Sequence, residues 1–186
     1  MRVIAGSARG RQLVSPRGTA TRPITDRVKE TLFGILGERV IGARVLDLYA
    51  GSGSVGIEAL SRGAASCEFV ERDHRAVAAI RENLDRADVA KDGSVHQMDV
   101  LRYLDHAADP LFNLVFVDPP YEERAILAPL ERLLARLARG AVVVVKHHWR
   151  TPIPEPSGLT RWRERRFGET TLTFLVANDG ADGVEE

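Results

Sequence analysis

The sequence predicts an α/β fold, in which a mostly parallel β-sheet carries helices on both faces. Short, continuously apolar runs alternate with segments in which apolar residues recur at helical spacing. Strands that are apolar at every position are typical of a parallel sheet that is buried on both faces. The length of 186 residues and the 44% share of hydrophobic residues suit one domain with a substantial core.

The chain begins with a basic arm, residues 1–22. Two strand-like runs, residues 3–5 and 12–14, flank a turn rich in glycine and serine and predict a two-stranded hairpin. An isolated hairpin is only marginally stable in water. We therefore expect this arm to lean on the main domain or to become ordered on a partner.

Residues 23–177 form the predicted main domain. Its first helix carries apolar residues over 28–36, and Thr25 or Asp26 can cap the amino end. The strands expected for the parallel sheet are residues 45–49, 67–70, 94–97, 113–117 and 141–145, and the helices are residues 55–62, 76–86, a short one after Asp99, and 126–137. Two further strands, 159–166 and 170–177, predict a terminal antiparallel pair. The acidic tail, residues 178–186, is expected to be disordered.

The composition excludes several classes of protein. Cys67 is the single cysteine, so neither a disulfide framework nor a cysteine-rich zinc site is possible. We see no apolar run that could span a membrane and no signal peptide, and we expect a monomeric, cytoplasmic protein. The net charge of zero hides an uneven distribution, because residues 1–25 carry five arginines and no acid.

Residues 47–56, DLYAGSGSVG, predict a turn that binds a nucleotide-like cofactor. The three glycines fit the pattern G-x-G-x-x-G between a predicted strand and a predicted helix. Glu71 lies at the end of the next strand, where an acid can accept hydrogen bonds from ribose hydroxyls. The residues expected to bind the cofactor are Asp47, Tyr49, Ala50, Gly51, Gly53, Gly56, Glu71, Arg72, Asp99 and Val100.

The same glycine pattern also describes an NAD-binding domain, and two carboxylates favour S-adenosylmethionine instead. Asp47 would crowd a pyrophosphate, but it suits a ligand with an ammonium group, such as the methionine part of S-adenosylmethionine. Asp99 follows the third predicted strand, where it can accept a hydrogen bond from the adenine amino group. The simpler alternative for both acids is that they cap helices.

Residues 115–121, VFVDPPY, place a second motif at the end of the fourth predicted strand, where open α/β sheets bind ligands. Asp118 and the carbonyl of Pro119 can accept the two N–H bonds of an amino group. Pro120 stiffens the backbone, and Tyr121 offers a ring for stacking on a planar substrate. We therefore predict Asp118, Pro119, Pro120 and Tyr121 as the catalytic residues of an enzyme that methylates an exocyclic amine. A tight turn without function is the alternative.

The chemistry of a nucleobase amine explains why this set is useful. Its nitrogen is a poor nucleophile because the lone pair is conjugated with the ring, and two acceptors can favour a pyramidal nitrogen. The remaining work is alignment and electrostatics, with Asp118 orienting the amine and taking its proton late. A base inside a helix cannot reach such a pocket, so the target must be single-stranded or flipped.

With both motifs placed, the chain resembles the bacterial methyltransferases that modify guanine N2 in 16S ribosomal RNA, the RsmD family. The matching stretches are RVIAGSARGRQL, RPITDRVKETLFGIL, VLDLYAGSGSVGIEALSRGA, FVERD with Asn83, MDV, LVFVDPPY and FGETTLTF. The resemblance implies a Rossmann-like class I methyltransferase with a seven-stranded sheet and an N-terminal hairpin that helps to dock RNA. It also implies S-adenosylmethionine as donor, S-adenosylhomocysteine as product, no metal, and a substrate within the 30S subunit or its precursor.

Two positions depart from the pattern of this family. Tyr49 stands where phenylalanine is common, and Lys146-His147-His148 ends the fifth strand where an acid is often found. We interpret His147 and His148 as a solvated strand end. Metal binding by the pair is not expected, because no third ligand is evident and the reaction needs no metal.

Two arginine clusters are candidates for phosphate contact. The first consists of Arg2, Arg9, Arg11, Arg17, Arg22 and Arg27. The second is the RWRERR segment, with Arg161, Arg163, Arg165, Arg166 and Trp162. A solvated surface is the alternative for each cluster.

The motifs leave rival functions open. N6-adenine and glutamine-N5 methyltransferases use similar Asx-Pro-Pro-Tyr pockets. An NAD-dependent oxidoreductase fits the glycine pattern but gives Asp118-Pro119-Pro120-Tyr121 no role. A noncatalytic RNA-binding module would not require Asp47, Glu71 and Asp118 together.

Overall fold

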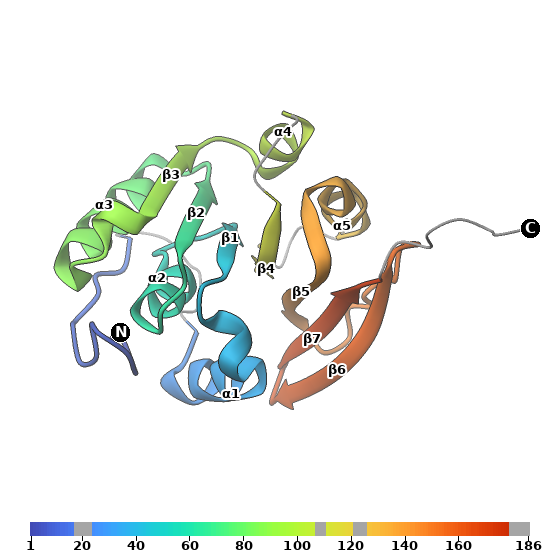
Figure 1. Ribbon diagram of the computed structural model, residues 1–186, viewed down its shortest axis with the longest axis horizontal. Coiled ribbons are helices and arrows are strands. Elements are labelled where there is room, and N and C mark those ends of the chain that lie inside the picture. Colours follow the sequence, from blue (N-terminus) through green and yellow to red (C-terminus); the bar gives the residue numbers. More distant parts are fainter. Residues whose placement is uncertain (17–23, 107–110, 121–125, 179–186) are drawn as a thin grey trace, which may run out of the picture.

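The computed structural model describes residues 1–16, 24–106, 111–120 and 126–178. Within them, seven strands form one sheet in the order β3-β2-β1-β4-β5-β7-β6 (Figure 1). The strands are β1 (Arg44–Leu48), β2 (Ser66–Glu71), β3 (Gly93–Gln97), β4 (Phe112–Val117), β5 (Leu137–His148), β6 (Leu159–Phe167) and β7 (Thr170–Ala177). β1 to β5 are parallel, and β7 runs antiparallel to both of its neighbours. The predicted tail, residues 179–186, lies outside the described residues.

Five α-helices connect these strands in the described part of the chain. They are α1 (Asp26–Leu36), α2 (Ser54–Ser61), α3 (His74–Ala87), α4 (Val100–Asp105) and α5 (Leu127–Leu133). Short 3₁₀ turns follow at η1 (Gly37–Val40), η2 (Ala90–Asp92) and η3 (Leu134–Arg136). Thr25 caps α1, as the sequence suggested, because its Oγ1 accepts a hydrogen bond from the Val28 N–H at 3.4 Å. No helix among the described residues is long and apolar enough to cross a membrane.

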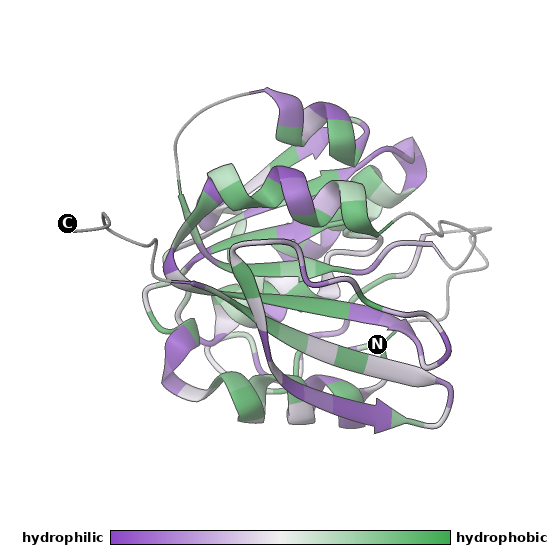
Figure 2. Ribbon diagram, turned by 90° about the vertical axis from the view of Figure 1, so that its right-hand side faces the viewer, coloured by the Kyte–Doolittle hydropathy of each residue, from purple (hydrophilic) through white to green (hydrophobic). Residues whose placement is uncertain are grey.

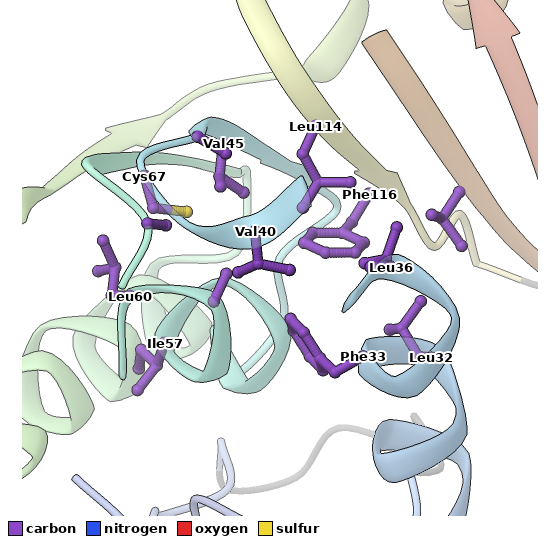
Figure 3. Close-up of a cluster of buried hydrophobic side chains, with 14 of the residues drawn as sticks. Leu32, Phe33, Leu36, Val40, Val45, Ile57, Leu60, Cys67, Leu114 and Phe116 are labelled. Carbon is purple, nitrogen blue, oxygen red and sulfur yellow. The ribbon is translucent and has the colours of Figure 1, made fainter. Parts of the chain in front are cut away.

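The helices bury the sheet from both sides, which explains why its central strands are apolar throughout. One cluster of buried side chains joins α1, α2 and α3 to one face, and a second joins α4 and α5 to the other. In the first cluster the rings of Phe33 and Phe116 lie 5.9 Å apart between α1 and β4 (Figure 3). The predicted three-layer α/β arrangement is therefore confirmed.

The fourth crossover differs in its boundaries from the prediction. The helix expected over 126–137 ends at Leu133, and β5 already begins at Leu137. Leu137 pairs with Phe112, and the register then shifts before Leu114 pairs with Val142. The apolar pattern marked only the centre of β5, because its first residues include a charge and a glycine.

The amino-terminal arm packs against the domain as part of its core. A single antiparallel bridge, between Arg2 and Gln12, gives the arm its hairpin form. Val3, Ala8 and Leu13 are buried in the same cluster as α1 and α2. The arm thus leans on the domain, which is one of the two possibilities that a marginal hairpin left open.

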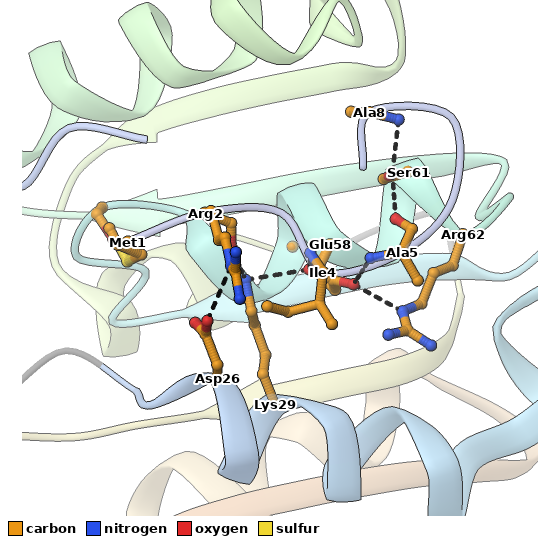
Figure 4. A network of polar contacts seen from close by, with 12 residues as sticks. Met1, Arg2, Ile4, Ala5, Ala8, Asp26, Lys29, Glu58, Ser61 and Arg62 are labelled. Carbon is orange, nitrogen blue, oxygen red and sulfur yellow. Dashed lines mark hydrogen bonds and ion pairs between the residues drawn. The ribbon is translucent and has the colours of Figure 1, made fainter. Parts of the chain in front are cut away.

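A buried carboxylate fastens this arm (Figure 4). Glu58, on α2, accepts hydrogen bonds from the N–H groups of Ile4 and Ala5 at 2.8 and 3.0 Å. It also pairs with Lys29 of α1 at 3.0 Å and with Arg62 at 2.8 Å. Each oxygen of the carboxylate therefore has partners, which offsets the cost of burying its charge.

Candidate functional site

The candidate site lies at the carboxyl ends of β1, β4 and β5. The strand order reverses between β1 and β4, and such a switch point is where open α/β sheets bind ligands. Val45, Phe116 and Val144 all belong to the cluster under α1 and α2. Because side chains alternate along a strand, Asp47, Asp118 and Lys146 point toward that same face. The fold thus gathers three charged side chains from three neighbouring strands.

The glycine turn connects β1 to α2 through a left-handed backbone. Tyr49, Gly51 and Gly53 have φ angles of 58°, 57° and 73°. Tyr49 is one of two described residues other than glycine with positive φ, a conformation that L-residues adopt at a cost. Ala50 accepts a hydrogen bond from the Gly53 N–H at 2.7 Å, which closes the turn.

Gly56 lets α2 lie close to the sheet. A Cβ atom at this position would stand 2.4 Å from Cε1 of Phe69 and 2.6 Å from Sγ of Cys67, too close for either contact. The first turn of α2 therefore sits directly over β2, and its N–H groups face the end of β1. The Gly56 N–H donates to Asp47 at 3.0 Å.

Asp47 is a buried carboxyl group without a basic partner among the described residues. Its side chain is 3% exposed, and no basic side chain among the described residues pairs with it. Burial raises the pKa of this carboxyl well above its usual range, the Gly56 hydrogen bond opposes that rise, and the charges of Asp118 and Glu71 add to it. A ligand with a positive charge would offset the cost of burying the ionised carboxylate. The methionine ammonium and the sulfonium of S-adenosylmethionine are such charges.

Glu71 is oriented by two backbone groups. Its Oε2 accepts a hydrogen bond from the Gly51 N–H at 2.9 Å, and its Oε1 accepts one from Asp73 at 2.9 Å. The carboxylate therefore lies beside the glycine turn, as the ribose-binding prediction requires. Ala50 joins the two strands, since its N–H donates to the Val70 carbonyl at 3.1 Å, and Arg72 is exposed at the surface.

Asp99 has a structural role in addition to the predicted contact with adenine. Its Oδ1 accepts hydrogen bonds from the N–H groups of Leu101 and Arg102 at 2.9 and 3.2 Å, which caps α4. Val100 is 3% exposed and packs in the cluster under α4 and α5. Helix capping, the simpler interpretation of Asp99, is thus present in the structure, and contact with adenine stays a prediction.

Asp118 forms a two-pronged ion pair with Lys146. The ammonium of Lys146 lies 2.9 Å from Oδ1 and 2.7 Å from Oδ2. The lysine side chain is 14% exposed and the aspartate 42%, so the pair has one side open to solvent. Burial raises the pKa of Asp118, and the Lys146 charge opposes that rise. Pro119 is half-buried and Pro120 exposed, and Tyr121 lies outside the described residues.

Sequence reasoning did not find Lys146. It treated the end of β5 only as a departure from a family pattern. The signal was nevertheless present, because Lys146 follows the last apolar residue of its strand just as Asp118 does. Val117 pairs with Val145, and this register brings the next residues, Asp118 and Lys146, together.

His147 corrects one expectation. The prediction placed it at a solvated strand end, but its side chain is buried, with 7% exposed. The ring lies on the opposite face of the sheet from Lys146, and Nε2 is 2.8 Å from Oγ1 of Thr173. Burial lowers its pKa, which favours the neutral ring. The neighbouring strand β7 supplies Thr173 for this contact; the sequence predicted that strand but not its register against β5.

Four of the predicted RNA-binding arginines are exposed on the arm and at the start of α1. Met1 Sδ approaches Ser52 Oγ to 3.6 Å just before α2, and the Ala8 N–H donates to Ser61 Oγ at 2.9 Å at its end. Arg2 is exposed and pairs with Asp26 at 3.0 Å, and Arg27 is exposed in the first turn of α1. Arg11 lies beside Arg2 across the hairpin, because the Val3 N–H donates to its carbonyl at 3.0 Å, and Arg9 is exposed in the hairpin turn. Arg17 and Arg22 lie outside the described residues.

The fold and this site define a Rossmann-like class I methyltransferase domain. The family model described as "Conserved hypothetical protein 95" matches residues 1–176. Ribosomal RNA small subunit methyltransferase D of Escherichia coli is 36% identical over 173 residues, which cover 91% of this chain and 86% of that protein. The chain therefore belongs to the RsmD family of bacterial methyltransferases, which confirms the resemblance seen in the sequence.

Two further relatives span nearly the whole chain. The Bacillus subtilis protein YlbH is 41% identical over 179 residues, which cover 94% of this chain and 97% of YlbH. The solved structure of the Escherichia coli protein yhhF superposes with a TM-score of 0.86 at 32% identity, covering 96% of this chain and 98% of that one. The predicted fold class is thus confirmed, including the antiparallel end of the sheet.

Proposed function

We propose that this protein transfers a methyl group from S-adenosylmethionine to the exocyclic N2 of a guanine in 16S ribosomal RNA. One observation carries the proposal: Lys146 fixes the Asp118 carboxylate at the end of β4, on the same face of the sheet as the unpaired acid Asp47. The small-subunit RNA as target is supported by the name of the 36% identical relative.

On the cofactor side, the chain offers acceptors for a cationic nucleoside. Asp47 can pair with the ammonium, Glu71 can accept from the ribose hydroxyls, and the glycine turn permits close approach. When bound, S-adenosylmethionine supplies a methyl group on a sulfonium, which is already a strong electrophile. The protein's remaining task is to align the acceptor nitrogen with it.

On the acceptor side, Asp118 is an oriented hydrogen-bond acceptor. A carboxylate has about four lone-pair positions, so Asp118 can bind Lys146 and a guanine amino group at the same time. The Pro119 carbonyl would accept the second N–H. The nitrogen lone pair then forms the new N–C bond, the C–S bond breaks with its electrons going to sulfur, and the amine loses one proton to Asp118 or to water.

The ion pair favours the ionised, hydrogen-bond-accepting form of Asp118 against the rise in its pKa that burial causes. The Lys146 ammonium contacts both oxygens of Asp118 and stabilises the ionised carboxylate. Asp118 therefore acts mainly by orienting and polarising the amino group of the substrate. This suits the reaction, because the product ammonium is acidic and its proton leaves readily once the N–C bond has formed. The protein acts, in this proposal, as a cytoplasmic monomer on a flipped base in the 30S subunit or its precursor.

The test is methylation of immature 30S particles from cells that lack this activity. The protein is incubated with labelled S-adenosylmethionine, and the label is mapped by nuclease digestion and mass spectrometry. We expect label on guanine N2 and its loss in Asp118→Ala, with cofactor binding largely retained. Label on adenine or on protein would reject guanine as the acceptor. Tight NAD binding without methyl transfer would reject the class of reaction.

A further inference from the structure

An aromatic side chain stands between two guanidinium groups just beyond the end of β5. The guanidinium carbon of Arg150 lies 4.7 Å from the centre of the Trp149 ring, and that of Arg166 lies 4.1 Å from it. The indole is 39% exposed, which is uncommon for so large an apolar group. Both arginines are exposed, and neither has an ion pair within the described residues.

The sheet register places this cluster at the same carboxyl edge of the sheet as the candidate site, but toward the opposite face. Trp149 follows the end of β5, three residues after Lys146, which contacts Asp118. Arg166 pairs with Thr171 and Thr171 with His147, so Arg166 lies on the face opposite to Lys146. Arg166 reaches this edge from β6, whose turn into β7 lies next to the end of β5.

Backbone contacts hold the cluster in one arrangement. The Trp149 N–H donates to the Glu169 carbonyl at 2.9 Å, and Nε of Arg166 donates to the Gly168 carbonyl at 2.8 Å. The Arg150 N–H donates to Nδ1 of His148 at 3.2 Å. Glu169 lies in the turn between β6 and β7, and the group of Glu169 that contacts Trp149 is its backbone carbonyl. A partner would therefore meet a surface that is already ordered, which lowers the entropy cost of binding.

We propose that Trp149, Arg150 and Arg166 dock single-stranded RNA that flanks the target base and passes over the carboxyl edge of the sheet. The inference rests on the proposed function and extends it to a second contact region. Unstacked bases bind to indole rings and to guanidinium planes, and the same arginines can reach phosphates. The hydrophilic outer strand β6 continues this basic surface along the edge of the sheet (Figure 2).

The hairpin offers a matched control in its second exposed tryptophan. Trp162 is 42% exposed and also stacks with an arginine, since the Arg39 guanidinium lies 5.3 Å from its ring. It sits in the middle of β6 and packs edge-on against Phe174 at 6.0 Å. It lies roughly 15 Å along the strand from the turn that holds Trp149, at about 3.3 Å per residue. The two tryptophans thus differ in position: Trp162 packs on Phe174 in the cluster under α1 and α2, whereas Trp149 lies beyond the end of β5 with two arginines.

The experiment measures RNA binding without catalysis. A fluorescein-labelled single-stranded RNA of mixed sequence is titrated with the wild-type protein, Trp149→Ala, Arg150→Ala/Arg166→Ala and Trp162→Ala over a series of salt concentrations. Trp149→Ala should weaken binding by about tenfold, the loss of one stacked base. The double arginine variant should flatten the slope of log K against log salt by about 1.4, or 0.7 for each lost phosphate contact. Trp162→Ala should change neither.

A second measurement separates this inference from the proposed function. The KM for immature 30S particles should rise about tenfold in Trp149→Ala, while the melting shift caused by S-adenosylhomocysteine stays at the wild-type value. Wild-type methylation with unchanged RNA affinity and KM in Trp149→Ala would overturn the inference alone. Weaker binding to the particle but not to free RNA would also overturn it, because the surface would then contact a ribosomal protein. If the wild-type protein methylates no guanine, the proposed function fails, and the RNA titration alone then tests whether Trp149, Arg150 and Arg166 bind RNA.

Discussion

Single residues in the candidate site carry acidic charges that lie close together at one edge of the sheet. Asp47, Glu71 and Asp118 are close enough for the charges of the latter two to raise the pKa of Asp47. Only Asp118 has a basic partner among the described residues, Lys146. An excess of buried negative charge at one edge of the sheet is unfavourable until a cation arrives.

Replacing Asp47 by asparagine should therefore stabilise the protein without ligand and abolish cofactor binding. Because the folded-state pKa of Asp47 is raised, the penalty is present above that pKa and disappears as the pH falls below the unfolded value of about 3.9. At pH 7 we expect a gain of about 0.5–2 kcal/mol, which shrinks toward pH 4. Thermal melting from pH 4 to 8 measures it. Asp99→Asn, which keeps its helix cap, should melt like the wild type, and an equal gain there would contradict this explanation.

The Lys146 ion pair makes a second prediction, in the pH dependence of turnover. Lys146→Met removes the charge that opposes the burial of Asp118, so the pKa of Asp118 should rise further. The ionised acceptor would then be lost at a higher pH, and the acidic limb of the kcat profile should move toward neutrality by about one pH unit. Lys146→Arg keeps the positive charge and should restore most of the wild-type profile. An unchanged acidic limb in Lys146→Met would show that Asp118 is not the titrating group.

The sequence predicted site residues well where strands end, and poorly where the contact depends on two distant elements. Glu71 and Asp118 were found because each ends or follows an apolar strand, and Asp47 because it lies just before the glycine turn; parallel strands place such positions at one edge. Lys146 also follows an apolar run, but it was interpreted only as a departure from a family pattern that has an acid at this position. The capping role of Asp99 was weighed as an alternative, because local hydrogen bonds depend on the nearest residues alone.

At the scale of elements, α2 is the support to which the glycine turn and the arm are both attached. Its first turn bonds to Asp47, and its buried Glu58 holds the arm and α1. Asn83 of α3 completes the link, because its amide donates to the carbonyls of Val14 and Ser52 at 2.9 Å. The arm is therefore coupled to the cofactor turn through packed and hydrogen-bonded groups.

Removing the charge of Glu58 should be strongly destabilising. Glu58→Gln leaves Lys29, which is 1% exposed, without its counter-ion, and such a loss typically costs about 3–5 kcal/mol. Urea unfolding measures the change. The matched control is Glu82→Gln, which breaks an exposed pair with Arg86 in α3 and should cost less than about 0.5 kcal/mol. Equal losses in the two variants would show that the buried pair is not special.

The elements themselves were predicted well, because hydrophobic periodicity reports the strands and helices that bury one or both faces. The packing of the arm was not predictable. Glu58 lies within an apolar helix, and its partners Lys29, Ile4 and Ala5 come from segments far away in the sequence. Periodicity identifies which face of a helix is buried, but it does not reveal which distant polar group will enter that face.

At the scale of the whole molecule, the residues proposed to bind the cofactor and those proposed to bind the acceptor come from different halves of the sheet. β1, β2 and β3 supply the glycine turn, Glu71 and Asp99, while β4 and β5 supply Asp118 and Lys146. The β6–β7 hairpin extends the acceptor half with an exposed basic strand. The net charge of zero is therefore compatible with RNA binding, because the basic groups gather in a few regions.

The division predicts a selective stabilisation by the cofactor product. S-adenosylhomocysteine at about 100 times its Kd should add about 2.7 kcal/mol to the free energy of unfolding. For a domain of this size that corresponds to a rise in Tm of roughly 5–10 °C. NAD at the same concentration should leave Tm unchanged, and differential scanning calorimetry distinguishes the two. A larger shift with NAD would assign the glycine turn to a different cofactor.

Cys67 makes this protein convenient for spectroscopy. It is the single cysteine of the chain, it is 1% exposed behind Gly56, and burial raises the pKa of its thiol. Thiol reagents react with exposed thiolates, so they should pass over Cys67 in the folded state. A dye or spin label could then be attached through Trp162→Cys alone, with every native residue around the glycine turn left in place. The approach of an RNA to the β6–β7 hairpin could be followed in this way.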